Sequence, residues 1–564
     1  TTLKENMRLY LLMNLIKKIE ITKLGGGDAT FAIRHKKFYS TTDEVSIFDA
    51  CKQVFDNVYD YNTDGLIFTP KLLPVGSIDG KTEAKMQKTT WEYSFKWKPP
   101  EYNTNDFLVS TKKDKQGKDI ISYKFDSGTN MEKNNLHQFK QLILRVGYNQ
   151  SIHGYLNPCQ RMLDEEWGHS REKAEYRPVP FYPTEPYDNK AHLCEIQMEQ
   201  NSEGYYVMRT SEGEVFEDNM IVEFAYDGGW KPLRVRYDKT EQYRRGEKNY
   251  GNAYHVANSN WHSIHHPISE EMLKTGDNIP HITNTIYYNP SLAKTHTREL
   301  RNFHNQGVKK FLLSMVAKEK DILIDLAVGK GGDIQKWHAE KLDFVLGIDN
   351  SLDNIVNAID GACARYLNIK KKYKYLTRAL FLKGNTSRNI KRGDAFDNQK
   401  NKSIVRAIFG SGARDSLDKA VARQYGKAMS GFNITSCQFA LHYFFENSDV
   451  LKGFLRNVAE CTKIGGYFIG TCYDGEKVFQ MLREKKKGEQ IRMYKDETKI
   501  WELTKQYNKD YFLPDITSLG YGIDVYQESI NKSFREYLVN FSFLEKTLLL
   551  YGFTLVDELG INGV

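Results

Sequence analysis

Residues 321–351 place the strongest constraint on the fold of this 564-residue chain. The apolar run 322–324 leads into a loop, 329–332, that holds three glycines, and a helical pattern starts directly after it. A second apolar run, 344–348, ends in Asp349. Strand, glycine-rich turn, helix and strand in this order predict a β-α-β unit that binds a nucleotide-like ligand, with the acid on a ribose hydroxyl. A tight turn in an ordinary parallel sheet is the alternative.

The residues of the loop indicate which class of ligand it binds. The loop lacks the G-x-G-x-x-G spacing of dinucleotide sites, and Asp333 stands where a pyrophosphate would lie. S-adenosylmethionine has a cationic methionine end and a neutral adenosine, so it suits the two carboxylates of Asp333 and Asp349 better. The sequence therefore favours this cofactor.

The pattern around this unit predicts an α/β domain from about residue 286 to residue 564. Strand-like runs alternate with helical segments, and this alternation is typical of a mostly parallel sheet. The expected strands are 322–327, 344–348, 380–384, 433–437 and 466–471.

Four stretches in this region carry a family resemblance. They are Gly-Lys-Gly-Gly-Asp at 329–333, Phe-His-Asn-Gln-Gly-Val-Lys at 303–309, Gln-Phe-Ala-Leu-His-Tyr at 438–443 and Glu-Tyr-Leu-Val at 536–539. In this order they resemble mRNA cap guanine-N7 methyltransferases, which have a Rossmann-like class I methyltransferase fold.

The resemblance implies two groups of site residues. Those for S-adenosylmethionine are Lys309, Ala327, Gly329, Lys330, Asp333, Asp349, Asn385 and Gln438, and those that position the cap guanine are Asn305, His442, Tyr443 and Glu536. Two positions depart from the family: Ala327 replaces a glycine, and Asn385 stands where an acid is expected near the adenine. Guanine N7 carries a free lone pair, so the reaction needs alignment rather than a general base.

Four stretches of the N-terminal half carry a second resemblance. Asp-Gly-Leu-Ile-Phe at 64–68, Lys-Trp-Lys-Pro at 96–99 with Asn-Asp-Phe at 105–107, and Arg-Val-Arg-Tyr-Asp-Lys at 234–239 resemble late motifs of the covalent nucleotidyltransferases, in the form found in mRNA guanylyltransferases. The resemblance implies bound GTP, Mg²⁺ or Mn²⁺, and contacts from Asp64, Lys96, Lys98, Asp106, Arg234, Arg236, Asp238 and Lys239.

Residues 110–225 alternate apolar and polar residues in short runs, which suits a small β-barrel. We therefore expect three parts: the end of a nucleotidyltransferase domain (1–108), an OB-fold barrel with a linker (109–285), and the methyltransferase (286–564). The family's nucleophilic lysine, in K-x-D-G, does not occur in the sequence. Either the chain begins inside that domain, or the domain has lost its activity.

Taken together, the motifs resemble the multifunctional mRNA-capping enzymes of large cytoplasmic DNA viruses. This implies capped or 5′-phosphorylated mRNA as substrate, RNA polymerase or a stimulatory subunit as partner, and a place in the viral factory of the host cytoplasm or in the virion. Two alternatives remain: an N-terminal half that only binds RNA as a scaffold, and a methyltransferase with another substrate.

Bulk properties exclude some classes of protein. The net charge of +8 is mild and permits a polyanionic partner without requiring one. Seven cysteines without C-x-x-C spacing predict free thiols in a reducing compartment and no zinc site. The histidines at 262, 265 and 266 lack suitably spaced acids, so we expect a surface loop rather than a metal site. No apolar run approaches the roughly 20 residues of a membrane span, so we expect a soluble protein.

Overall fold

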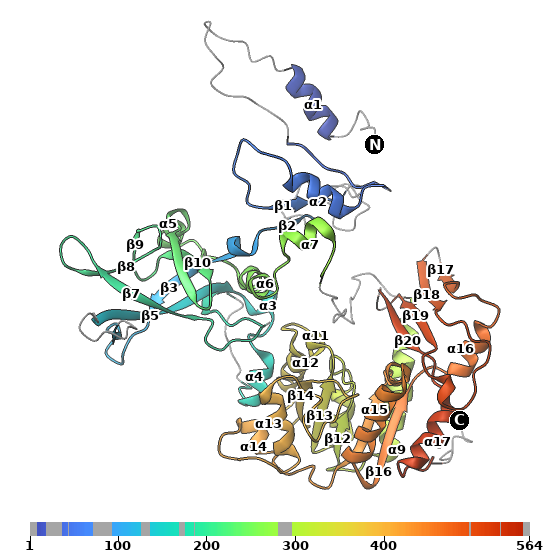
Figure 1. Cartoon of the computed structure of the whole chain (residues 1–564). Helices are drawn as coiled ribbons and strands as arrows, with labels where there is room; N and C mark the ends of the chain where they lie inside the picture. Colours follow the sequence, from blue (N-terminus) through green and yellow to red (C-terminus); the bar gives the residue numbers. More distant parts are fainter. Residues whose placement is uncertain are drawn as a thin grey trace.

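The computed structural model (Figure 1) describes most of the chain. The described residues are 8–18, 36–42, 44–70, 93–125, 136–167, 175–184, 186–279, 296–495, 498–528, 530 and 532–556. The polar linker expected before residue 286 lies largely outside them.

A five-stranded parallel sheet forms the centre of the C-terminal half. Its strands lie in the order β14-β13-β12-β15-β16, so the chain starts in the middle and crosses over to both sides. The strands are β12 (Ile322–Asp325), β13 (Phe344–Asp349), β14 (Arg378–Lys383), β15 (Phe432–Gln438) and β16 (Thr462–Thr471). All neighbouring pairs are parallel, which confirms the five expected strands and the α/β prediction.

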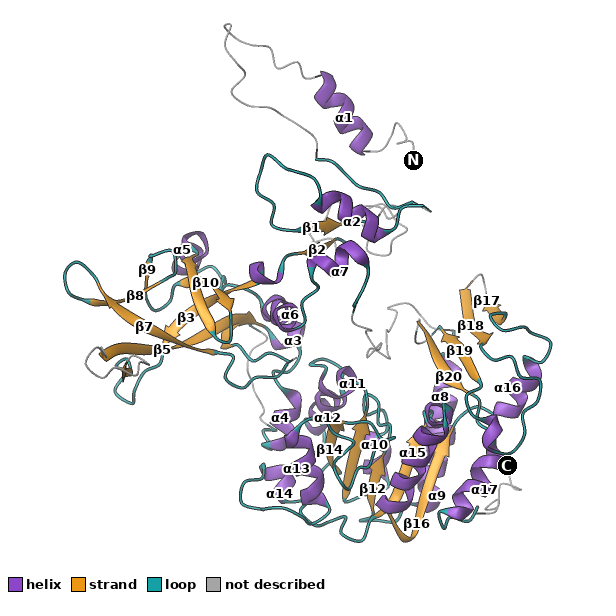
Figure 2. Ribbon diagram, viewed as in Figure 1, coloured by secondary structure: helices purple, strands orange, loops and turns teal. Residues whose placement is uncertain are grey.

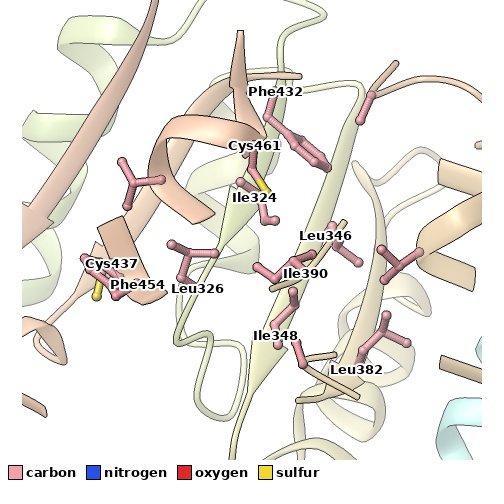
Figure 3. Packing of buried hydrophobic residues seen from close by; sticks show 14 of the residues in the cluster. Ile324, Leu326, Leu346, Ile348, Leu382, Ile390, Phe432, Cys437, Phe454 and Cys461 are labelled. Atoms are coloured by element: carbon pink, nitrogen blue, oxygen red, sulfur yellow. The ribbon is translucent and has the colours of Figure 1, made fainter. Parts of the chain in front are cut away.

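Successive side chains along these strands enter two different cores. Ile324, Leu346 and Leu382 belong to the core on one face of the sheet (Figure 3), whereas Leu323 and Val345 belong to the core on the other. Side chains alternate between the faces of a strand, and a parallel sheet buries both faces, so nearly continuous apolar runs are what such strands require.

Helices cover both faces of this sheet, as Figure 2 shows. Residues of α13, α15 and α17 pack into the first core, and residues of α9, α10, α11 and α12 pack into the second. The helices of this half are α8 (Arg298–Asn302), α9 (Lys310–Val316), α10 (Ile334–Ala339), α11 (Leu352–Val356), α12 (Ala362–Lys370), α13 (Gln399–Ile408), α14 (Lys419–Ala422), α15 (Ser448–Cys461), α16 (Gly475–Met481) and α17 (Phe541–Leu550), with the π-helix η3 (Phe303–Lys309) and the 3-10 helices η4 (Leu441–Phe445) and η5 (Ile516–Ser518).

A second, four-stranded antiparallel sheet follows the parallel one in sequence. Its strands, in spatial order, are β17 (Gln490–Lys495), β18 (Thr498–Lys505), β19 (Gly522–Gln527) and β20 (Lys532–Tyr537). The sequence did not predict it. Strand β20 carries Glu536 and lies against η4, which carries His442 and Tyr443, so this sheet brings the end of the chain to the parallel sheet.

The N-terminal half contains a nine-stranded sheet whose strand pairs are antiparallel. Its strands are β3 (Thr104–Thr111), β4 (Ile121–Phe125), β5 (Leu136–Tyr148), β6 (Arg177–Pro180), β7 (Leu193–Gln200), β8 (Tyr206–Arg209), β9 (Val215–Phe216), β10 (Ile221–Tyr226) and β11 (Trp230–Val235). The sheet curls so that β11 lies close to β7, and Trp230 of β11 donates its indole N–H to the carbonyl of Ala191 beside β7, at 2.7 Å.

The remaining N-terminal elements are α1 (Arg8–Lys18), α2 (Ile47–Phe55), β1 (Leu66–Phe68), β2 (Phe95–Trp97), η1 (Pro100–Tyr102), α3 (Gln150–His153), α4 (Pro158–Leu163), α5 (Tyr237–Arg244), α6 (Tyr254–His265) and α7 (Glu270–Thr275). Strand β3 runs across residue 108, so the expected division there falls inside one strand. The expectation of a surface loop around the histidines is wrong: His262 and His265 lie on α6, and Trp261, the residue before His262, packs into the core of the nine-stranded sheet.

The prediction that all seven cysteines are free is also wrong. Cys159 and Cys363 form a disulfide that joins α4 to α12, across a sequence separation of 204 residues. Cys51, Cys194, Cys437, Cys461 and Cys472 are free. Among the described helices, none is long and apolar enough to cross a membrane.

Candidate functional site

Three carboxylates lie around the glycine loop at the carboxyl ends of β12 and β13. Asp325 and Asp349 are the last residues of these strands, and Asp333 follows the loop and precedes α10. Loops at the carboxyl ends of parallel strands are where open α/β sheets bind ligands. The structure therefore brings the two predicted acids together and adds Asp325.

Backbone and amide groups surround the carboxylate of Asp349. One oxygen accepts the Gly329 N–H at 2.8 Å, and the other accepts the Ser351 N–H at 2.9 Å and the Asn354 amide at 3.0 Å. Burial raises the pKa of Asp349, and these hydrogen bonds oppose that shift. The bond to Gly329 ties the end of β13 to the loop, so the acid and the loop form one unit.

The pKa values of Asp325 and Asp333 are shifted in opposite directions. Burial, with repulsion from Asp333, raises the pKa of Asp325 to about 7. At Asp333 burial also disfavours ionisation, but Lys309 at 3.1 Å and Lys336 at 2.7 Å outweigh it and lower the pKa. Lys309 lies at the end of η3, so the π-helix brings the expected cofactor lysine to the expected cofactor acid.

The loop between β12 and α10 has the conformation that its glycines allow. Gly329 (φ 53°) and Gly331 (φ 69°) take left-handed conformations that side chains rarely adopt. Ala327 has no positive φ, so the departure from the family glycine causes no backbone strain there. The side chain of Lys330 is buried and pairs with Asp353 at 3.1 Å and Asp360 at 2.7 Å, so it anchors the loop to the protein.

A second group of polar side chains lies between η4 and β20. His442 and Glu536 are both buried, with 3.6 Å between the imidazole Nε2 and a carboxylate oxygen. Both ring nitrogens of His442 lack a hydrogen-bond partner within the described part of the chain. Burial lowers the pKa of His442 to about 3 and raises the pKa of Glu536 to about 8. Tyr443 packs edge-on to His442, and Tyr473 stacks on it at 5.3 Å.

A residue with a strained backbone precedes η4 and contacts η3. Phe439 has φ 56°, an uncommon conformation for a bulky side chain, and its N–H donates to the Thr471 backbone carbonyl and hydroxyl, both at 2.9 Å. Its ring packs on His304 of η3 at 4.7 Å, and Lys309 lies 5.6 Å from the ring centre. Strain of this kind is held by its surroundings and is found at functional sites, as π-helices are.

The other expected residues of this half have identifiable partners. The Asn305 amide donates to the Arg301 carbonyl, as a helical side chain on η3. Gln438, at the end of β15, donates to Ser436 and accepts from Thr471. The Asn385 amide oxygen accepts from the backbone and hydroxyl of Ser387.

The expected phosphate-binding residues of the N-terminal half fall into two groups. In the first, Lys98 follows β2 and lies 3.6 Å from Asp64, while Lys96 is exposed on β2. In the second, Asp106 of β3 is buried and accepts from Arg236 at 2.6 Å and from Lys239 at 2.5 Å. Asp106 of the sheet thus contacts the cations at the start of α5, although 130 residues separate Asp106 from Arg236.

The last two expected residues of this half take part in ion pairs. Arg234 pairs with Glu223 at 2.7 Å, and Asp238 lies 3.4 Å from Arg236. Within the described residues no cluster of three or more His, Cys, Asp or Glu side chains could hold a metal ion.

Comparison with protein families identifies a known domain in the C-terminal half. Residues 289–561 match the family model for the mRNA (guanine-N(7))-methyltransferase domain. The C-terminal half carries such a domain. The methyltransferase domain contains the three carboxylates, η3, η4 and β20, so both groups of polar side chains described above belong to it.

Comparison with individual proteins extends the similarity toward the N-terminus. The chain is 26% identical over 525 residues to a probable mRNA-capping enzyme of Acanthamoeba polyphaga mimivirus, covering 88% of this chain and 40% of that protein. It is 29% identical over 266 residues to the mRNA cap guanine-N(7) methyltransferase of Saccharomyces cerevisiae, covering 47% of this chain and 52% of that protein. The chain thus spans about half or less of the length of these relatives.

A solved structure, an S-adenosylmethionine-dependent methyltransferase from Clostridium acetobutylicum, is also similar to this chain. The sequences are 15% identical, the TM-score is 0.26, and the match covers 46% of this chain and 94% of that one.

Sequence reasoning missed three residues of the methyltransferase domain site. Asp325 directly precedes the loop, and the position at the end of the first strand could have revealed it. Lys336 lies one helical turn after Asp333, a spacing that brings side chains together. The strain at Phe439 depends on tertiary packing, so no local signal in the sequence points to it.

Proposed function

We propose that residues 286–564 transfer a methyl group from S-adenosylmethionine to N7 of the guanine in capped RNA. The observation that carries the proposal is the buried pair of His442 and Glu536, in which His442 follows β15, the strand that pairs with β12 and its terminal Asp325. Buried polar groups need partners, because an unsatisfied one costs about 1–3 kcal/mol. A polar, planar ligand such as a purine would satisfy both side chains.

The carboxylates of the loop fit S-adenosylmethionine. Asp349 can accept from the ribose hydroxyls, since a carboxylate has lone pairs beyond the three hydrogen bonds found here. Lys309 suits the methionine carboxylate, and the ionised Asp333 suits the methionine ammonium group. Ala327, Gly329, Lys330, Asn385 and Gln438 complete the proposed cofactor residues, with Lys330 acting through its ion pairs with Asp353 and Asp360. When bound, the cofactor supplies an electrophilic methyl group on a sulfonium.

The second group of side chains suits guanine. Glu536 can accept from guanine N1–H and the 2-amino group, and His442, which stays neutral, can donate or accept one hydrogen bond. Tyr443 and Asn305 are further proposed contacts. Methylation leaves the guanine ring cationic, and an ionised carboxylate in a buried site stabilises that charge. No residue has to remove a proton, so alignment and charge account for catalysis.

Transfer to capped RNA with S-adenosylmethionine carrying a labelled methyl group tests this proposal. We expect label on RNA that begins GpppA and none on RNA that begins ApppA. Glu536→Gln should lower transfer severely, whereas the matched exposed variant Glu545→Gln should leave it unchanged. Label at a position other than N7, or equal transfer to both RNAs, contradicts the proposal.

For the N-terminal half we propose part of an mRNA guanylyltransferase, with the end of a nucleotidyltransferase domain joined to an OB-fold at β3. Two observations support it. The similarity to the mimivirus capping enzyme covers 88% of the chain and so extends into this half. The buried Asp106 pairs with both Arg236 and Lys239, as a site for phosphates would require. GTP with Mg²⁺ or Mn²⁺ would bind there and at Asp64, Lys96 and Lys98, with Arg234 and Asp238 beside them.

The partners proposed for the whole protein are capped or 5′-phosphorylated mRNA and an RNA polymerase or stimulatory subunit. The proposed location is the viral factory in the host cytoplasm, with the virion as a second location. Copurification of the protein with viral RNA from infected cells tests the proposed RNA partner and the proposed location in infected cells.

A further inference from the structure

One segment of the N-terminal half leaves the nine-stranded sheet and packs on the methyltransferase domain. We call residues 154–167, which lie between β5 and β6, the bridging arm. Figure 1 shows its helix α4 beside α12, α13 and α14. Met162 packs into the core on one face of the parallel sheet and Leu163 into the core on the other. The arm therefore covers the edge of this sheet at β14, where an uncovered strand would expose both cores.

The arm contacts one stretch of the methyltransferase domain with particular closeness. The Tyr155 N–H donates to the Ala358 carbonyl at 2.8 Å, and Cys159 is joined to Cys363 just beyond it. Gly154 approaches Ala358 so closely that an added Cβ would lie 2.2 Å from the carbonyl oxygen. The Tyr155 hydroxyl donates to Asn368 of α12 at 2.7 Å. The arm thus holds residues 352–361, which run from α11 to the start of α12.

The other side of residues 352–361 holds the proposed cofactor loop. Asp353 and Asp360 are the two partners of the buried Lys330, in the middle of the loop. Asn354 donates to the Asp349 carboxylate at 3.0 Å. Asn357 binds Asp353 through its amide and accepts the N–H of Asp360, so the two acids are fixed relative to each other.

These contacts form a continuous connection from the bridging arm to the loop and Asp349. We propose that the arm is a positioning element for the cofactor: by fixing residues 352–361, it holds Lys330 and Asp349 in the geometry that binds S-adenosylmethionine. This rests on the proposed function, because it assumes that the loop binds that cofactor. The arm contacts neither His442 nor Glu536. It should therefore affect the binding of the cofactor and leave the binding of the cap guanine unchanged.

A pair of glycine variants of the full chain tests the proposal. Gly154 (φ 75°, ψ −153°) and Gly204 (φ 82°) both have a positive φ that favours glycine, so alanine strains the backbone at both positions. An added Cβ at Gly154 meets Ala358, whereas at Gly204, in the turn between β7 and β8, it meets nothing within 4 Å. Gly154→Ala therefore disturbs the arm at its contact with the methyltransferase domain, whereas Gly204→Ala strains a turn outside that contact.

We expect Gly154→Ala to weaken S-adenosylmethionine binding about tenfold in calorimetry, and Gly204→Ala to leave it within twofold. Affinity for the cap analogue GpppA should stay within twofold in both variants. Equal cofactor affinity in the two variants overturns the proposal, and so does a parallel loss of cofactor and cap affinity, which would indicate general loss of structure.

Two further measurements keep the inference separate from the proposed function. Amide hydrogen exchange without ligand should be faster at residues 352–361 in Gly154→Ala than in Gly204→Ala, and unchanged exchange overturns the inference even if the enzyme proves active. If the unaltered chain binds no S-adenosylmethionine, the proposed function fails instead. Should Gly154→Ala not fold, Tyr155→Phe removes only the bond to Asn368, and we expect a smaller loss of cofactor affinity in the same direction.

Discussion

The affinity for the cap should depend on pH through a single buried acid, Glu536. Guanine presents two donors, N1–H and the 2-amino group, and only the ionised carboxylate accepts both without offering a hydrogen of its own. Burial raises the pKa of Glu536 to about 8, so most molecules carry the neutral acid at pH 7. Because the ionised form is the one proposed to bind guanine, affinity should rise with pH until the carboxyl has titrated.

The size of the effect follows from that pKa. With a pKa of about 8, roughly 1% of the carboxyl groups are ionised at pH 6 and roughly half at pH 8. The dissociation constant for GpppA should therefore fall about fiftyfold over this range, which corresponds to about 2.3 kcal/mol. The neighbouring His442, with a pKa of about 3, stays neutral throughout and does not contribute to the dependence of the affinity on pH.

Calorimetry with GpppA between pH 6 and pH 8 measures this dependence. Glu536→Gln is the control, because its amide does not titrate, and its affinity should be weak and nearly flat with pH. ApppA lacks both donors and should show no gain at high pH. A flat profile for the unaltered protein would mean that Glu536 is ionised at pH 6 or does not contact the base, and would refute the reasoning.

Three further predictions concern other parts of the chain. Asp349→Ala should weaken S-adenosylmethionine binding by about 1.5–3 kcal/mol, or roughly 10- to 150-fold, since it removes a charge-assisted acceptor, and unchanged affinity in calorimetry would exclude the assignment. Lys330→Met should lower the free energy of unfolding by about 1–3 kcal/mol in urea titrations, because Asp353 and Asp360 lose their partner. Incubation with labelled GTP and Mg²⁺ should leave this chain unlabelled on denaturing gels, because K-x-D-G is absent, and a labelled band would reveal a different nucleophile.

The parallel sheet and its loop could be predicted from sequence because their signals are local. The strands 322–325 and 344–349 are apolar almost without interruption, as strands buried on both faces must be, and glycine marks the two loop positions with positive φ. The acids of the loop followed from the same stretch. Each of these features depends on neighbours within about 30 residues.

The remaining features depend on contacts between distant segments. Strands β17–β20 mix polar and apolar residues, so no long apolar run signals them. Partners far apart in sequence, such as His442 with Glu536 or Cys159 with Cys363, follow from packing and not from spacing. The inward orientation of Lys330 was not predicted either, although its partners Asp353 and Asp360 lie within 30 residues, because the fold of the segment after β13 decides where these acids lie.

The bridging arm also has a consequence for how the chain is made. The ribosome completes the nine-stranded sheet well before the parallel sheet, yet Met162 and Leu163 find their partners only in the later half. The 204 residues that separate Cys159 from Cys363 take roughly 10–40 s to synthesise, and through that interval the apolar face of α4 has nothing to cover it. The nascent N-terminal half should therefore require protection from aggregation until α12 and β14 emerge.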